Sequence, residues 1–174
     1  MGKYKSIIPL IAIFCILLVI GCTEQKATAH NGDSVSIRYT AKFENNTVFD
    51  SSGDKLLTFV TGSREVIKGV DYAIIGMAEG ENKTITIAPE DAYGIHRTDL
   101  TRIENITALK NAGYSTKVGT AVSVTLGNNT SVGTIIESNS THAVIDFNHL
   151  LAGKTLIFDI TLIKINKKTS GTFQ

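Results

Sequence analysis

Apolar and polar residues alternate strictly along positions 34–43, the first regular pattern after the N-terminal region. A period of two places alternate side chains on opposite faces, so this segment is predicted to be a strand with one buried face. A polar turn at 44–47 and the apolar start of 48–50 predict an antiparallel partner strand. Two further strands are predicted at residues 56–60 and 83–88.

A helical period interrupts these strands once. The apolar positions that recur at helical spacing are Val70, Ala73, Ile74 and Met77. They predict one short helix within residues 66–77, and Gly76 and Gly80 limit its length. The last regular segment, residues 156–165, is densely apolar, and this density predicts a central strand that is buried on both faces.

A different pattern occupies residues 96–148, between the fourth strand and the last one. A short helix is predicted at 106–111 because Gly113 follows it, and three strands with polar turns are predicted after it. These strands span residues 121–126, 132–137 and 142–147. The chain therefore reads as an α+β fold in which a small β-rich unit is inserted.

The N-terminal region has the features of a targeting segment. Lys3 and Lys5 precede an apolar run of fourteen residues, 7–20, which is shorter than the ~20 residues that a membrane span needs. Residues 19–22 resemble a lipobox, in which Cys22 receives lipid and becomes the new N-terminus. The alternative is an uncleaved signal anchor that extends through Cys22. In either case we expect an exported protein anchored to the outer face of the cytoplasmic membrane.

Composition and charge exclude several classes of function. The net charge of +1, with 19% charged residues, does not favour a nucleic acid partner. The two cysteines, Cys15 and Cys22, both precede the folded region, so no disulfide is expected within it. The four histidines are scattered without the spacing of metal ligands, and no metal or other cofactor is expected. They are His30, His96, His142 and His149.

Six asparagines stand in glycosylation sequons, with Ser or Thr two residues later and no proline between. They are Asn45, Asn82, Asn105, Asn128, Asn129 and Asn139. Two interpretations remain open. The sequons suit a glycosylated surface protein, and they also arise wherever Asn and Thr share a polar turn.

Four short motifs occur in a fixed order along the chain: residues 47–52, 65–69, 88–94 and 156–159. Together they resemble the FKBP family of peptidyl-prolyl isomerases. The insertion, closed by residues 148–153, resembles that of the SlyD-like branch. The resemblance implies an antiparallel sheet wrapped on one short helix, with an insert-in-flap domain. The expected units are a signal segment (1–22), a linker (23–30), the first part of the FKBP domain (31–95), the insert (96–148), the last strand (149–166) and a polar tail (167–174).

Prolyl isomerisation requires no nucleophile and no metal. Rotation about an X–Pro bond has a barrier of ~18–20 kcal/mol because the amide bond is partly double. An apolar cleft that excludes water from the carbonyl, with a few hydrogen-bond donors, favours the twisted amide. The family resemblance implies that the catalytic cleft is formed by Tyr39, Phe49, Asp50, Phe59, Val66, Ile67, Val70, Tyr93 and Phe158.

The resemblance also implies roles for some of these residues. The Ile67 backbone N–H and the Tyr93 hydroxyl would donate to substrate carbonyls, and Asp50 would bond the Tyr39 hydroxyl. Val70 stands where the family often has tryptophan, which predicts a roomier pocket floor. Taken singly, each aromatic residue could instead be ordinary core, and Asp50 could be a turn residue.

The insertion of SlyD-like proteins binds exposed apolar segments of unfolded chains. Its candidates for an apolar groove here are Ile103, Ile106, Leu109, Val122, Val124, Ile135 and Val144, although these could also be the insert's own core. His149 and Leu150, in the flap motif, are candidates for structural or substrate contacts.

We therefore expect a monomeric prolyl isomerase and chaperone for unfolded or proline-containing polypeptides. The alternatives are a non-catalytic chaperone on the same fold and a ligand-binding surface lipoprotein.

Overall fold

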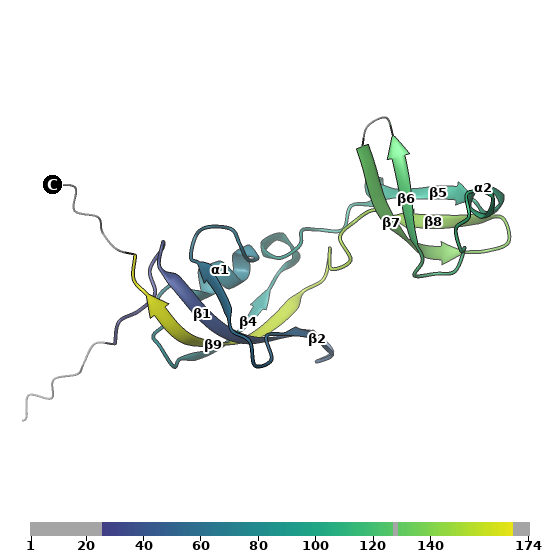
Figure 1. The fold of residues 1–174 in the computed structure, drawn as a ribbon. Coiled ribbons are helices and arrows are strands. Elements are labelled where there is room, and N and C mark those ends of the chain that lie inside the picture. Colours follow the sequence, from purple (N-terminus) through teal and green to yellow (C-terminus); the bar gives the residue numbers. More distant parts are fainter. Residues whose placement is uncertain (1–25, 127–128, 169–174) are drawn as a thin grey trace, which may run out of the picture.

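The computed structural model describes residues 26–126 and 129–168, which form two antiparallel sheets (Figure 1). The lipobox with Cys22, and the sequon at Asn128, lie outside the described residues. The first sheet contains β1 (Ser34–Phe43), β2 (Val48–Ser51), β3 (Leu57–Val60), β4 (Asn82–Ile87) and β9 (Leu156–Asn166), with α1 (Lys68–Ile74) packed on it. The second contains β5 (Thr101–Asn105), β6 (Ala121–Leu126), β7 (Asn129–Ser138) and β8 (His142–Asp146), with α2 (Ile106–Asn111). The predicted α+β fold is confirmed.

The strand β9 lies between β1 and β4, so its predicted central position is confirmed. The prediction that both of its faces are buried was wrong. Leu156, Phe158, Ile160 and Leu162 are buried, but the residues between them are partly exposed. The reason is that α1 covers only one face of the sheet. On the other face Asp159 pairs with Lys42 at 2.5 Å and accepts a hydrogen bond from the Thr84 hydroxyl at 2.6 Å.

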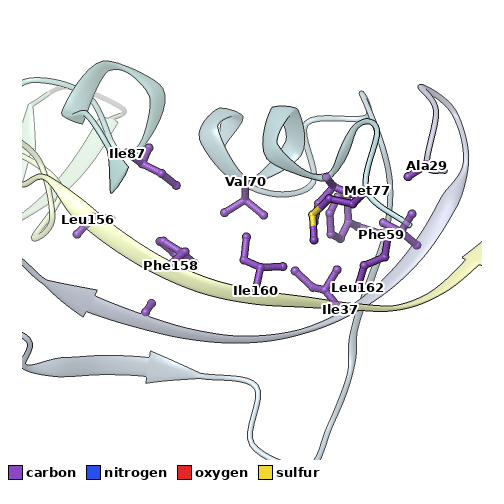
Figure 2. Packing of buried hydrophobic residues seen from close by; sticks show 13 residues of the cluster. Ala29, Ile37, Phe59, Val70, Met77, Ile87, Leu156, Phe158, Ile160 and Leu162 are labelled. Atoms are coloured by element: carbon purple, nitrogen blue, oxygen red, sulfur yellow. The ribbon is translucent and has the colours of Figure 1, made fainter. Parts of the chain in front are cut away.

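The helix α1 is held close to the sheet by its apolar face and by one glycine. Val70 points from α1 toward the β9 residues Phe158 and Ile160 (Figure 2). At Gly69 an added Cβ would lie only 2.4 Å from the Ile87 side chain, so only glycine permits this approach. The short α1 therefore positions the residues at its N-terminal end directly over the concave face of the sheet.

The second sheet has four strands in the order β5-β8-β7-β6, where the sequence predicted three. The missed strand β5 has a single aliphatic residue, Ile103, so it carries no alternating pattern. It is recognised only through its pairing with β8, from Thr101 to Asn105. The helix α2 has its predicted bounds, and its first turn is capped by Asn105 Oδ1, which accepts from Thr107 N at 2.7 Å.

Three of the sequon asparagines cap local turns. The side-chain oxygens of Asn45, Asn105 and Asn139 each accept a hydrogen bond from the backbone N–H two residues later, at 2.7–3.0 Å. The residue in that position is the threonine of the sequon. Turn geometry therefore accounts for these three Asn-x-Thr patterns without a glycan.

The chain ends of the first sheet are bound to each other. Ala29, which the sequence pattern placed in the linker, is fully buried and its N–H donates to Met77 O at 2.8 Å. Asp33 accepts from Lys167 Nζ at 2.9 Å and from the Lys168 N–H at 3.0 Å, so the first residues of the predicted polar tail are part of the folded domain. The hydrogen bond from Lys167, followed by that from Lys168, lowers the pKa of Asp33 from its usual 3.8 to about 2.

Helices long and apolar enough to cross a membrane are absent from residues 26–126 and 129–168.

Candidate active site

A cavity of about 440 Å³ opens between α1 and the concave face of the first sheet. Tyr39 and Phe158 form its aromatic wall on β1 and β9, with ring centroids 5.8 Å apart. Val70 lines the cavity from α1, where it is buried and points toward Phe158 and Ile160 (Figure 2). Val66 and Ile67 enter from the loop before α1. The cavity is thus mainly apolar and open at one side.

The Tyr39 hydroxyl donates to Asp50 Oδ2 at 2.8 Å across the β1–β2 pair. Burial of the ring, reinforced by this hydrogen bond to a carboxylate, raises the pKa of Tyr39 to about 12. Tyr39 therefore remains protonated at neutral pH, and its proton is directed at Asp50. The exposed carboxylate of Asp50 supplies a fixed negative charge at the rim of the cavity.

At the cavity, the Ile67 N–H and the Tyr93 hydroxyl have no hydrogen-bond partner within the described part of the chain. Ile67 is the N-cap of α1 with extended backbone angles, so its N–H precedes the hydrogen-bonded turns of the helix. Tyr93 follows the short helix η1 (Pro89–Asp91), and the turn is closed by Gly94 N–H donating to Pro89 O at 2.7 Å. Both donors are available to carbonyl oxygens of a bound peptide.

His149 stacks on Tyr93, with ring centroids 4.2 Å apart and planes 4° apart. Its Nδ1 accepts from the Leu151 N–H at 3.1 Å, which fixes the ring from the other side. His149 is therefore placed to orient Tyr93. Leu150 is 79% exposed and does not line the cavity.

Hydrogen bonds at the base of the insert join its two connecting segments. Gly153 N–H donates to Gly94 O at 2.8 Å, and an added Cβ at Gly153 would lie 2.9 Å from His96 Cβ. His96 Nε2 lies 2.9 Å from Asp146 Oδ2, and Asn148 Nδ2 donates to Asp146 Oδ1 at 2.7 Å. Burial of Asp146 opposes its ionisation, but hydrogen bonds from Asn148 and His96 outweigh burial and lower its pKa. The insert is thus joined to the segment that carries Tyr93.

Two of the nine expected catalytic residues do not line the cavity. Phe59, on β3, is buried in the core, and Phe49 packs against Phe43 with ring centroids 4.6 Å apart. Four residues that the sequence analysis missed do line it: Ile37, Leu57, Arg64 and Glu65. The strand alternation could have indicated Ile37 and Leu57, because they lie two residues from Tyr39 and Phe59 on the same strand faces.

The structure separates the seven groove candidates of the insert into three groups. Ile106, Leu109, Val122 and Ile135 are buried in the insert's own core, so these four cannot form an open groove. Val124 is partly buried against that core. Ile103 is 73% exposed and pairs across β5 and β8 with the half-buried Val144. Only this last pair lies on the outer face of the sheet.

Side chains able to hold a metal ion do not cluster within residues 26–126 and 129–168. The cavity instead combines aromatic and aliphatic walls with the free donors of Ile67 and Tyr93, the Arg64 guanidinium, and the carboxylates of Asp50 and Glu65. Such a site can desolvate an amide and bind its carbonyl oxygens. This is the chemistry that isomerisation of an X–Pro bond requires.

The sequence of the chain is similar to those of known proteins. The family model for FKBP-type peptidyl-prolyl cis-trans isomerases matches residues 25–163. The chain is 33% identical over 137 residues to the FKBP-type peptidyl-prolyl cis-trans isomerase SlyD of Helicobacter pylori. The aligned region covers 74% of this chain and 73% of that protein. It is 31% identical over 133 residues to a probable FKBP-type 16 kDa isomerase of Pseudomonas fluorescens, which covers 75% and 87%.

Over a shorter region of 75 residues the chain is 45% identical to FK506-binding protein 2 of Yarrowia lipolytica. This region covers 42% of this chain and 50% of that protein. The family match extends over most of the chain, and the matched residues include every residue that lines the cavity. The chain therefore belongs to the FKBP-type peptidyl-prolyl cis-trans isomerases and is SlyD-like.

Proposed function

We propose that this isomerase acts on unfolded proteins outside the cytoplasmic membrane, that its insert holds the unfolded chain, and that the monomeric enzyme is anchored by its N-terminus. The observation that carries the chaperone role is an exposed apolar surface on the insert. It consists of Ile103, Val132, Ile136 and Val144, and we call it the outer face of the insert.

The strand register places these residues on the side away from the insert's core. Val144 lies between Ala143 and Ile145, which are both buried, so its side chain points to the opposite face, with Ile103 beside it. On β7, Val132 precedes the buried Gly133 and is 62% exposed. Exposed apolar residues that gather on one face indicate an interaction surface. An apolar face of this kind can bind exposed apolar segments of unfolded chains without reading much of their sequence.

The catalytic step uses the residues of the cavity. The proline ring enters against Phe158 and Val70, where water is excluded, and the Ile67 N–H and Tyr93 hydroxyl donate to carbonyls of the client. Loss of water from the amide carbonyl disfavours the planar, charge-separated form and lowers the barrier to rotation. Because the insert is joined to the segment carrying Tyr93, a client bound on the insert has a high local concentration at the cavity.

Export and anchoring rest on the N-terminal sequence. The basic start, the apolar run of residues 7–20 and the lipobox-like Cys22 support a lipid or a retained helix as the anchor. Folded structure begins by Thr28, which pairs with Ala78. At about 3.5 Å per residue, the chain between Cys22 and Thr28 spans at most ~20 Å. The catalytic domain would therefore work close to the membrane surface.

The test of the chaperone role compares two substrates, a proline-containing tetrapeptide and an unfolded protein whose refolding is limited by prolyl isomerisation. A double variant, Ile103→Ser with Val132→Ser, should isomerise the peptide at the parent rate. Its kcat/KM on the protein should fall by about tenfold, because the local concentration of client is lost.

Val118→Ser provides a matched control, since Val118 is equally exposed on the insert but lies in a turn outside the outer face. Equal losses on both substrates, or an equal loss in the control variant, would contradict the proposal that the insert binds the unfolded client while the cavity isomerises it.

A further inference from the structure

A second cavity, of about 940 Å³, lies beside the catalytic one on the side of α1. The two cavities share three lining residues: Arg64, Val66 and Ile67. Besides Val66 and Ile67, the apolar lining of the second cavity consists of Tyr72 on α1, Ile75 at the C-cap of α1, and Ala92, next to Tyr93. A peptide that leaves the catalytic cavity over Ile67 would therefore pass directly into this second cavity.

The side chains that form this second cavity are held in place by polar contacts. Asp71, which is buried on α1, accepts the Gly62 N–H with both carboxylate oxygens, at 2.8 and 3.0 Å. This fixes the loop of residues 62–65 to the helix. Lys68 Nζ lies 2.6 Å from Asp91 Oδ1 and 5.4 Å from the centre of the Tyr72 ring. Tyr72 is therefore oriented although it is 66% exposed.

Arg64, at the junction of the two cavities, has a left-handed backbone with φ of 66°. This conformation is unfavourable for a residue other than glycine, and such residues concentrate at functional sites. Arg64 makes no hydrogen bond or ion pair within the part of the chain that the structure describes. Its guanidinium donors are free for backbone carbonyls of a chain that crosses from one cavity to the other.

The direction of the client follows from the placement proposed for it in the first cavity. Asp50 and Tyr39 line this cavity from the sheet, and Ile67 lines it from the N-cap of α1. In the proposed placement the amide before the proline lies on the side of Asp50, and the Ile67 N–H binds the chain on the other side of the proline ring. The segment that follows the proline therefore leaves over Ile67 toward Tyr72 and Ile75.

We propose that the second cavity is a subsite for the client residues that follow the proline, and that it selects an apolar side chain there. This inference rests on the proposed placement of the proline in the catalytic cavity. The apolar surfaces of Tyr72, Ile75 and Ala92 match an aliphatic or aromatic side chain. Discrimination between an apolar and a polar residue in such a site amounts to about tenfold in kcat/KM.

The test uses short peptides in which cis–trans exchange is measured by NMR without a protease. One pair carries Leu or Ser at both positions after the proline, and a second pair carries Leu or Ser at the position before it. The full chain in mild detergent should favour the Leu peptide of the first pair by about tenfold. The double variant Tyr72→Ser with Ile75→Ser should lose this preference and keep the parent rate on the Ser peptide.

Three comparisons make the test decisive. The preference at the position before the proline should be unchanged in the double variant, and Val48→Ser, an exposed apolar position that lines neither cavity, should match the parent throughout. A parent that isomerises the first pair equally well would overturn the subsite and leave the isomerase intact. Equal losses on all peptides in the double variant would also overturn it. A parent that accelerates no peptide would overturn the isomerase function itself, and the subsite with it.

Discussion

Tyr93 and His149 lie face to face although the whole insert separates them in the chain, and their ring planes differ by 4°. Tyr93 is in the last turn before the insert and His149 is in the first turn after it. The stack therefore closes the base of the insert at the same point where a free hydroxyl faces the catalytic cavity. We infer that His149 is a positioning residue for Tyr93 and not a group that touches the proline.

Replacement of His149 tests this positioning role. His149→Ala removes a stacked pair worth ~0.5–1.5 kcal/mol, so kcat/KM on a short peptide should fall by a factor of about two to ten. His149→Phe keeps a flat ring and should restore most of the rate. Peptide isomerisation by the two variants checks the expectation. If His149→Phe is as impaired as His149→Ala, the imidazole has a role beyond stacking.

Within the cavity, loss of the apolar wall should cost more than loss of one donor. Tyr93→Phe removes a neutral hydrogen bond, worth ~0.5–1.5 kcal/mol. Phe158→Ala opens a cavity in a buried wall, at ~3–5 kcal/mol of folding free energy, and admits water to the site. Urea unfolding and peptide isomerisation of both variants measure the two effects. A Phe158→Ala variant with the parent stability and activity would show that the wall lies elsewhere.

The hydrogen bonds of Asp33 with Lys167 and Lys168 should make the free energy of unfolding depend on pH in the acid range. Asp33 has a pKa of about 2 when folded, below its usual 3.8, so its stabilising contribution is present above about pH 4 and is lost as the pH falls toward 2. In Asp33→Asn the free energy of unfolding should be lower at neutral pH and should vary less between pH 4 and 2. Lys167→Met removes the main cause of the low pKa, so the acid-linked loss of stability should be smaller and should be complete at a higher pH than in the parent.

Denaturant unfolding measured at each pH checks this expectation. Asp54→Asn is the control, since Asp54 lies on an exposed turn after β2. A pH dependence of Asp33→Asn identical to that of the parent would show that the acid sensitivity arises at other carboxylates.

The anchor can be identified from the mass of the membrane-extracted protein. If Cys22 carries lipid, the mature chain begins there, and Cys22→Ser should change both the mass and the membrane retention. Cys15→Ser should change neither, because Cys15 lies in the discarded apolar run. If residues 7–22 remain as a helix, both variants should stay in the membrane with only the mass of the substitution. An N-terminus at Met1 or Gly2 would contradict lipidation.

The pattern of the sequence alone determined the elements whose faces differ in polarity. The alternation of β1 and the helical spacing in α1 were readable because burial on one side imposes a period on the side chains, and the apolar density of β9 indicated its central position in the sheet. The family was indicated separately, by the resemblance of the motifs around Asp50, Ile67 and Tyr93 and by their order along the chain.

The tertiary structure decided which apolar residues face a cavity and which face the core. Phe59 and Ile135 have the same apolar pattern as true surface candidates, and only packing against other elements shows that they are buried. The strand β5 shows no alternation because Ile103 is its single aliphatic residue, and no period can be read from one apolar position. The stack of His149 on Tyr93 joins residues that are distant in the chain, and the lining that the two cavities share at Arg64 combines residues of different elements. Periodicity could not indicate either, because it relates only residues along one element.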